Sequence, residues 1–386
     1  MTDSHTVPQN WAAAQIAAVT AQGLMGTSDP ATFRPNQTLT AQALANLVVG
    51  LQVVLTPPVT TPPDPNPPTN AGDGIPADPT QPVPPGDPGA TTTPNPTPTV
   101  PAPTTPATPA PTVVKTAKVA DPYAAVTMAQ LDAKLVNALG LSGAAGEFVA
   151  GAKAAGLKVP SRFGTEVVAR LLGLRLNHPA NEDGLELRPN DPATRAEAAY
   201  SAAQILTFAG DDGLAVAAVQ GLADTFSLPA FSDWQTRILD TAVSKIGMPY
   251  IWGGTSDGAE APFGVQSRGG YDCSGFVWRV YKLQSYPGEG DLASVLRGRT
   301  TFVMSVEVPK SERIGFADLQ PGDVLFFGAE GPRSSSAEVD HMAIYIGNNW
   351  FIQSSSYGVA LATLTGYYKQ RFAWARRPLQ EAGLSG

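Results

Sequence analysis

A proline-rich stretch divides this chain and limits what the remainder can fold into. Residues 57–112 hold most of the chain's 37 prolines, with Thr, Asp, Ala and Gly at most other positions. Because aromatic and aliphatic side chains are almost absent, this segment cannot bury a core. We expect a disordered or polyproline II linker, about 3.1 Å per residue and able to reach beyond roughly 150 Å. A plain tether and a Pro-rich ligand for an aromatic groove both stay open, although no basic residue accompanies any PxxP here.

The composition of the whole chain limits its partners. The 386 residues are 43% apolar and 15% charged, enough for two modest cores. A net charge of −8 and a pI near 5 argue against nucleic-acid binding, which needs a basic surface. No run of about 18 apolar residues is present, so we expect no transmembrane segment. The first six residues are neither basic nor apolar, so no signal peptide is visible.

The single cysteine, Cys273, lies where glycine-rich sequence gives way to an apolar pattern. Helical spacing relates Phe276, Val277, Val280 and Tyr281. This pattern predicts that Asp272 is an N-cap and Cys273 the first helical residue. A thiol at that position is near the positive end of the helix dipole, which favours the thiolate. A buried structural cysteine is the alternative.

Three short strands are predicted downstream, over residues 323–327, 341–347 and 350–353, with turn residues between them. His341 begins the second strand and shares one face with Ala343 and Tyr345, while the apolar residues between them face the other way. The imidazole is therefore free to lie outside the core. A neighbouring imidazole is the usual base for a cysteine nucleophile, so Cys273 and His341 are candidate catalytic residues.

Residues from about 232 to 380 resemble an NlpC-type cell-wall cysteine peptidase, a small papain-like fold. The likeness rests on four ordered motifs: Gly247-x-Pro249-Tyr250-x-Trp252-Gly253-Gly254, Asp272-Cys273-Ser274-Gly275, Pro321-Gly322-Asp323 and the His341 strand. The resemblance implies hydrolysis of a peptide bond in the peptidoglycan stem, usually next to D-glutamate, with Cys273 as nucleophile and His341 as base. The family's third polar residue falls on Gln353. Gln can accept from an imidazole N–H but brings no charge.

Strand register decides between Gln353 and Ser354 as the orienting residue. A two-residue turn at Asn348 and Asn349 pairs Ile344 with Gln353 and places Ser354 beside the face of His341. A three-residue loop that includes Gly347 makes Ala343 oppose Gln353, which then shares the face of His341. We favour Gln353, mostly on the resemblance.

The resemblance also implies that Tyr250, Asp272 and Ser274 are substrate-binding. An acidic side chain suits the stem's free amine, and a phenol can donate to a developing oxyanion. A pure helix cap is the equal alternative for Asp272. The spacing from Cys to His leaves two long stretches, 292–315 and 328–339, as specificity elements or surface insertions.

The sequence around the linker is helical and weakly repetitive. Arg34-Pro35-Asn36 before Thr40 returns as Arg188-Pro189-Asn190 before Thr194, and a third helix start follows Thr127. Each Thr can cap a helix, and Glu197 can complete a capping box. Together with residues 7–12, these segments resemble degenerate surface-layer-homology repeats, which bind cell-wall polymers. A helical spacer without affinity is the alternative; in either case we expect one α bundle.

The predicted fold is α+β: a compact papain-like domain, with the Cys-bearing helix on an antiparallel sheet, after helical repeats and the linker. The predicted boundaries are 1–56 and 113–224 for the repeats, 57–112 for the linker and 225–386 for the peptidase, which we expect to fold and cleave small stem peptides alone. No metal or cofactor is implied. The expected protein is a cysteine endopeptidase of the cell envelope or secreted; an amidase or acyltransferase, or a silent peptidoglycan-binding protein, is the alternative.

Overall fold

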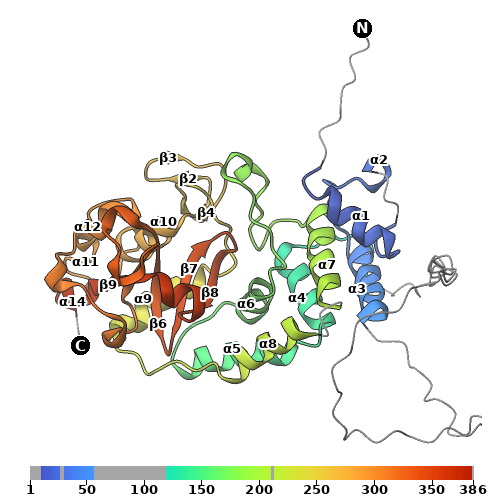
Figure 1. Cartoon of the computed structure of the whole chain (residues 1–386). Coiled ribbons are helices and arrows are strands. Elements are labelled where there is room, and N and C mark those ends of the chain that lie inside the picture. The colour runs from blue at the N-terminus through green and yellow to red at the C-terminus, as the bar shows by residue number, and fades with distance from the viewer. Residues whose placement is uncertain (1–9, 27–29, 56–118, 210–212, 385–386) are drawn as a thin grey trace, which may run out of the picture. The chain divides into compact units, whose positions relative to one another are not determined.

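The computed structural model describes residues 10–26, 30–55, 119–209 and 213–384. The predicted linker, 57–112, lies outside them. A helical half precedes residue 225, and an α+β half follows it (Figure 1). No single helix in the described ranges is long and apolar enough to cross a membrane; Met128–Ala138 and Ser142–Ala154 pass that test only as a pair, bent by 117°.

The helical half is built around the three predicted helix starts. Its elements are α1 (Ala13–Ala21), α2 (Pro30–Phe33), α3 (Ala41–Leu55), α4 (Met128–Ala138), α5 (Ser142–Ala154), α6 (Phe163–Leu171), the 3-10 helix η1 (Ala180–Leu185), α7 (Arg195–Ala209) and α8 (Leu214–Asp224). Short backbone bridges join Thr38 to Thr194, Thr40 to Ala125 and Thr127 to Pro192. The segments that enter α3, α4 and α7 therefore meet at one junction.

The predicted threonine caps are present, but the capping box lies elsewhere. The hydroxyl of Thr194 accepts the backbone N–H of Glu197 at 3.2 Å. The complete box is formed by Thr127 and Gln130. The carboxylate of Glu197 is buried and lies 3.5 Å from the imidazole of His178. The expectation of a box at Glu197 is therefore wrong, because this side chain turns inward to a buried partner.

The α+β half contains a five-stranded antiparallel sheet in the order β8-β7-β6-β5-β9. Its strands are β5 (Val324–Gly328), β6 (Val339–Gly347), β7 (Trp350–Ser355), β8 (Gly358–Thr363) and β9 (Phe372–Arg376), preceded by the two-residue strands β1 (Thr255–Ser256), β2 (Glu260–Ala261), β3 (Gly264–Val265) and β4 (Gly270–Tyr271). Its helices are α9 (Asp233–Ser244), α10 (Cys273–Trp278), α11 (Leu292–Val295), α12 (Thr301–Val306), α13 (Gly366–Arg371) and α14 (Pro378–Glu381), with the π turn η2 (Arg279–Leu283) after α10 and the 3-10 turns η3 (Lys310–Glu312), η4 (Phe316–Asp318), η5 (Gly331–Arg333) and η6 (Ser336–Glu338).

Helix α10 packs on β6, and this contact forms the centre of the core (Figure 1). Phe276 and Val277 of α10 are fully buried, as are Met342 and Ile344 of β6. Phe327, Ala343 and Tyr345 belong to a second apolar cluster. The alternation predicted for this strand is confirmed, and so is the α+β fold with the cysteine helix on an antiparallel sheet.

The β6–β7 hairpin reaches the favoured register by an unexpected route. Asn348 and Asn349 have φ of 48° and 63°, and Gly347 pairs with Trp350, so the loop has two residues. A register shift follows between Tyr345 and Gly347, after which Ile344 pairs with Ile352. The extra residue in β6 acts as a bulge and turns Gln353 to the face of His341. Of the two open loop lengths the structure has the two-residue one, and the predicted strand start at His341 is wrong, since β6 begins at Val339.

Buried side chains of the helical half bind the backbone of the α+β half. Arg170 donates to the carbonyl oxygen of Gly247 at 2.6 Å and to that of Tyr357. Gly247 has φ +96°, and a Cβ there would lie 2.7 Å from the carboxyl carbon of Glu166, so only glycine fits. The contacts of Arg170 fix the start of the segment that leads to the cleft.

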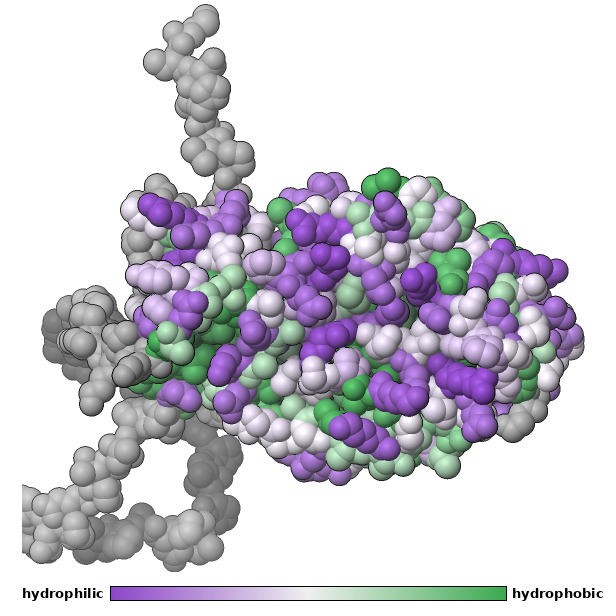
Figure 2. Space-filling model, turned by 180° about the vertical axis from the view of Figure 1, so that it is seen from behind, coloured by the Kyte–Doolittle hydropathy of each residue, from purple (hydrophilic) through white to green (hydrophobic). Residues whose placement is uncertain are grey.

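On the face in Figure 2, hydrophobic residues form small patches among hydrophilic ones.

Candidate active site

Cys273 lies where the sequence predicts it, at the start of a helix. Asp272 is the N-cap of α10, and its Oδ1 accepts the backbone N–H of Gly275 at 2.5 Å. A Cβ on Gly275 would come 1.9 Å from the carbonyl oxygen of Gly254, which explains the glycine in this motif. The Cys273 sulfur lies 3.4 Å from the hydroxyl of Thr301. The thiol is thus held between α10 and the start of α12.

The electrostatics of the thiol differ from the expectation. Burial and the neighbouring Asp272 carboxylate raise the pKa of Cys273, although Thr301 and the backbone N–H of Met342 oppose this shift. Burial lowers the pKa of His341, and the Gln353 hydrogen bond opposes that shift only in part. This direction runs against the expectation that the helix start favours the thiolate: α10 has only six residues, and burial raises the pKa of the thiol. Both shifts favour a neutral thiol beside a neutral imidazole.

His341 is oriented by a chain of hydrogen bonds across β7. Its Nε2 lies 2.7 Å from Oε1 of Gln353, and the Gln353 amide donates to the Tyr368 hydroxyl at 2.7 Å. Because Oε1 can only accept, Nε2 carries the proton and Nδ1 keeps its lone pair. The alternative residue, Ser354, is buried and donates to the carbonyl oxygen of Tyr271. The structure thus brings Gln353, the favoured candidate, into contact with His341.

Asp272 is tied into a network that sequence reasoning did not find. Besides its cap bond, it accepts from Ser274, from the backbone N–H of Gly253 and from both terminal nitrogens of Arg299, at 3.0 to 3.1 Å. Arg299 also donates to Ser274 at 2.7 Å. A carboxylate offers about four lone-pair sites, and these contacts occupy them. This geometry favours a structural role for Asp272 over a free acceptor for an ammonium group.

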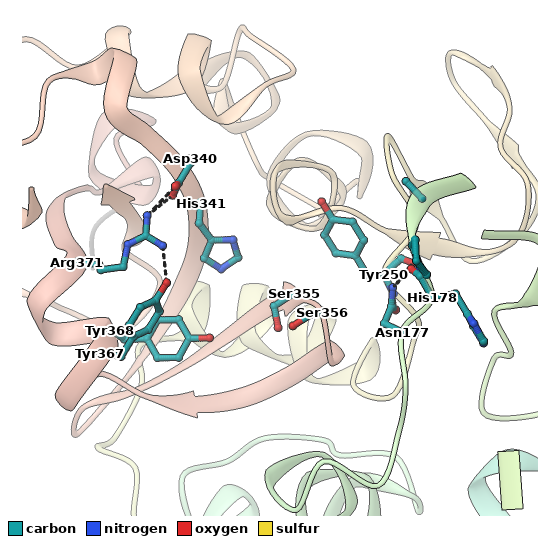
Figure 3. Close-up of a pocket in the computed structure, with 12 residues that line it drawn as sticks. Asn177, His178, Tyr250, Asp340, His341, Ser355, Ser356, Tyr367, Tyr368 and Arg371 are labelled. Atoms are coloured by element: carbon teal, nitrogen blue, oxygen red, sulfur yellow. Dashed lines mark hydrogen bonds and ion pairs between the residues drawn. The ribbon is translucent and has the colours of Figure 1, made fainter. Parts of the chain in front are cut away.

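A cleft of about 610 Å³ opens beside His341. Its lining residues are Asn177, His178, Pro179, Ala180, Tyr250, Asp340, His341, Ser355, Ser356, Tyr367, Tyr368 and Arg371 (Figure 3). Figure 3 shows the Tyr250 hydroxyl pointing toward the side of the cleft where His341 lies. Burial and the nearby Cys273 and Asp272 raise the pKa of Tyr250, so the phenol keeps its proton as a hydrogen-bond donor.

The cleft has two walls from different halves of the chain. Tyr367, Tyr368 and Arg371 line one side from α13, and residues 177–180 line the other from the helical half. On the α13 side, Arg371 pairs with Asp340 at 2.6 Å and donates to Tyr367 at 2.8 Å. Sequence reasoning placed the whole site after residue 245 and therefore missed the 177–180 wall.

Two further site residues come from the long stretch between Cys273 and His341. Arg299 and Thr301 both lie in the segment 292–315, which the sequence left open as specificity element or insertion. The only available signal was the position of that segment between the two candidate catalytic residues. The other segment, 328–339, forms η5 and η6, which pack against β9 and α12.

Comparison with known proteins assigns the α+β half to a family. The NlpC/P60 family model matches residues 247–377. The chain is 30% identical over 173 residues to the Murein DD-endopeptidase MepS/Murein LD-carboxypeptidase of Escherichia coli (strain K12), covering 44% of this chain and 77% of that protein.

The chain belongs to the NlpC/P60 family.

Two other relatives match this chain over less of their own length. The "Probable peptidoglycan endopeptidase LytE" of Bacillus subtilis (strain 168) is 32% identical over 37% of this chain and 34% of its own length. The Gamma-D-glutamyl-L-lysine dipeptidyl-peptidase of the same organism is 26% identical over 37% of this chain and 41% of that protein. The chain thus spans less than half the length of these two relatives. A crystal structure of an NlpC/P60 family protein from Bacillus cereus ATCC 10987 is 27% identical, covers 40% of this chain and 42% of that one, and gives a TM-score of 0.29.

The N-terminal region matches a second model. The S-layer homology domain model covers residues 1–40. The described part of this range contains α1 and α2. The resemblance predicted from the repeats is confirmed for this region, and it indicates association with the cell surface.

Proposed function

We propose that this chain is a cysteine endopeptidase that cuts a peptide bond in the peptidoglycan stem, and that its helical half holds it at the cell wall. The observation that carries the proposal is the 2.7 Å contact between Gln353 and His341, on the strand against which the Cys273 helix packs. This arrangement provides a nucleophile, a base and an orienting group from three adjacent elements, as acyl transfer requires. No described group of three or more His, Cys, Asp or Glu residues could hold a metal ion.

The proposed reaction starts from the neutral pair. Nδ1 of His341 takes the thiol proton as the Cys273 sulfur attacks the scissile carbonyl carbon. The Tyr250 hydroxyl donates to the oxyanion that forms. The imidazolium then returns its proton to the leaving amine, and water hydrolyses the acyl-enzyme by the reverse sequence, with His341 again as base. Gln353 keeps the ring aligned through both steps.

The proposal also specifies which bond is cut, namely the one next to D-glutamate. Its support is the NlpC-type motif set and the relative named for γ-D-glutamyl cleavage. The relative named as a murein DD-endopeptidase makes a D,D-peptide bond the competing target. Fragment masses distinguish the two, because only the first cut leaves a fragment that ends in D-glutamate.

Purified sacculi digested with the full chain, with the products identified by mass spectrometry, test the proposal. We expect new stem fragments from the wild type and none from Cys273→Ala, which removes one sulfur from a folded protein. Equal release by Cys273→Ala would contradict the assignment of the nucleophile. Transfer of the acyl group to an added amine instead of water would favour the acyltransferase alternative, and binding without any release would favour a silent wall-binding protein. Sedimentation of an active-site variant with wall material tests the targeting role of the helical half.

A further inference from the structure

One side chain of the helical half holds the backbone from which Tyr250 enters the cleft. Oδ1 of Asn177 accepts the backbone N–H of Tyr250 at 2.7 Å, and Nδ2 of Asn177 donates to the carbonyl oxygen of Tyr250 at 3.2 Å. Figure 3 shows the two residues in contact at the edge of the cleft. Two residues further on, the backbone N–H of Trp252 donates to Asp183 at 3.1 Å.

The lead-in segment needs such an external partner because it is not part of a strand. Residues 249–251 have no regular secondary structure, and they connect α9 to β1. A buried or half-buried backbone must satisfy its polar groups, and here the donor and the acceptor of Tyr250 both pair with one amide. An asparagine amide offers both functions at the right separation, whereas a carboxylate could only accept.

Asn177 itself is anchored in the helical core. The next residue, His178, is buried, and its backbone N–H donates to the carboxylate of Glu186. Its imidazole lies 3.5 Å from Glu197 and meets the ring of Trp11 edge-on, with 4.6 Å between the ring centroids. Trp11 lies in the range that matches the S-layer homology model. A continuous set of contacts thus joins that region to the cleft.

We propose that Asn177 is a positioning residue for Tyr250, so that the helical half completes the active site as well as attaching it to the wall. This inference rests on the proposed function, in which the Tyr250 hydroxyl meets the oxyanion. Asn177 acts through the Tyr250 backbone: without the clamp, the phenol samples directions that do not reach the transition state. A loss of alignment in the transition state lowers kcat more than it raises KM.

The kinetic test is a double-mutant cycle on a soluble stem peptide with the full chain. We expect Asn177→Ala to lower kcat roughly 10-fold to 100-fold with KM changed less than about twofold. In a Tyr250→Phe background, the same substitution should add less than about a twofold loss, because the group that it aligns is already absent. Asp240→Ala is the matched control, since Asp240 accepts the Lys158 backbone N–H at 2.7 Å across the same two halves. It should leave kcat within about twofold. An equal loss from Asn177→Ala in both backgrounds would overturn the inference.

Hydrogen exchange tests the clamp without any substrate. The Tyr250 amide should exchange faster in Asn177→Ala than in the wild type and Asp240→Ala, and Asn177→Asp should give an intermediate rate because it keeps only the acceptor. Unchanged protection in Asn177→Ala would refute the clamp. This result is independent of the proposed function, which fails separately if wild-type release of stem fragments does not depend on Cys273.

Discussion

The two halves of the molecule bury charge in different ways. In the α+β half, the core is aliphatic and aromatic, and its buried ionisable groups include Asp272 beside the thiol and Asp323 and Arg376 near β5 and β9. The helical half buries more charged side chains, some within the bundle and some where it meets the α+β half. They are Asp132, Glu166, Arg170, Arg175, His178, Asp183, Glu186 and Glu197.

Some of the buried charges of the helical half contact the α+β half, and others pair within the bundle. Arg175 pairs with Asp132 at 2.7 Å, and Arg170 lies 3.4 Å from Glu166 while it binds two carbonyl oxygens of the α+β half. Buried ion pairs contribute little net stability compared with apolar packing, but breaking one is costly. The Arg170–Glu166 pair therefore helps to fix which surfaces of the two halves meet. The helical half supplies that contact, and the α+β half supplies the thiol and the base, while the main apolar core runs through both halves.

Removing the helical half should have the largest effect on activity. A chain of residues 225–386 keeps Cys273, His341 and Gln353 but loses the 177–180 wall and the partner of Tyr250. We expect its kcat/KM on a small soluble stem peptide to fall at least about 100-fold, which replaces the expectation that this part acts alone. Steady-state kinetics beside the full chain give the ratio, and circular dichroism checks folding. A folded fragment with full activity would show that the wall serves only attachment.

Breaking the buried contact between the halves should cost stability more than chemistry. Arg170→Met removes the cation and leaves Glu166 without its charged partner and two carbonyl groups without donors. The expected loss is about 3–5 kcal/mol of unfolding free energy. The double variant Arg170→Met with Glu166→Gln should recover part of this loss, because no buried charge then stays unpaired. Urea unfolding of both variants measures the difference; equal losses would show that the ion pair is not coupled.

Removing the orienting group of the α+β half should affect rate and pH dependence. Gln353→Ala should lower kcat roughly 10-fold to 1000-fold, because the imidazole keeps its accepting nitrogen but loses alignment. The proposed reaction needs a neutral His341 imidazole and a protonated Cys273 thiol. Because the pKa of His341 is lowered from 6.5 and that of Cys273 is raised from 9.0, the plateau of the wild-type pH–rate profile should start below pH 6.5 and extend above pH 9.0. Since the Gln353 hydrogen bond opposes the lowering of the His341 pKa, its loss should move the acid limb to still lower pH.

A matched control tests the choice of orienting residue. Ser354 neighbours Gln353 but binds the carbonyl oxygen of Tyr271, away from the imidazole. Ser354→Ala should therefore leave the acid limb of the pH–rate profile in place. A shifted limb in Ser354→Ala, with an unshifted one in Gln353→Ala, would contradict the hydrogen bond seen here.

The parts of the site that follow local rules could be predicted from sequence. The N-cap at Asp272 and the alternation around His341 depend on neighbours in the chain, and both are present in the structure. Gln353 of β7 lies on the face of His341, as favoured from the sequence. This register depends on a bulge in β6, however, and no turn residue in the sequence indicates that bulge. The contacts of Asn177 with Tyr250 and of Arg299 with Asp272 span 73 and 27 residues. Such contacts depend on tertiary packing, which local sequence patterns do not encode.

The smallest expected effect concerns the pH dependence of the helical half. Burial raises the pKa of Glu186 to about 7, from an ordinary value of 4.5. Between these values the unfolded chain has released this proton and the folded chain still holds it, so stability falls as pH rises from about 4.5 to 7. Burial opposes a raised pKa at His178, but its hydrogen bond with Glu197 and the nearby carboxylates outweigh burial. The stability that His178 contributes is likewise present at low pH and is lost as pH rises through its raised pKa.

Glu186→Gln keeps an acceptor for the His178 backbone N–H and cannot ionise, so it should match the wild type near pH 4.5. At pH 7.5 it should be more stable than the wild type by about 1–2 kcal/mol, less than the full shift because the folded protein relaxes around the ionised carboxylate. Thermal unfolding of both proteins at the two pH values measures this difference, and Gln353→Ala, which lies in the other half, should show no such pH-dependent gain. A constant offset between wild type and Glu186→Gln at both pH values would mean that Glu186 ionises normally, and that the buried charges of the helical half serve geometry alone.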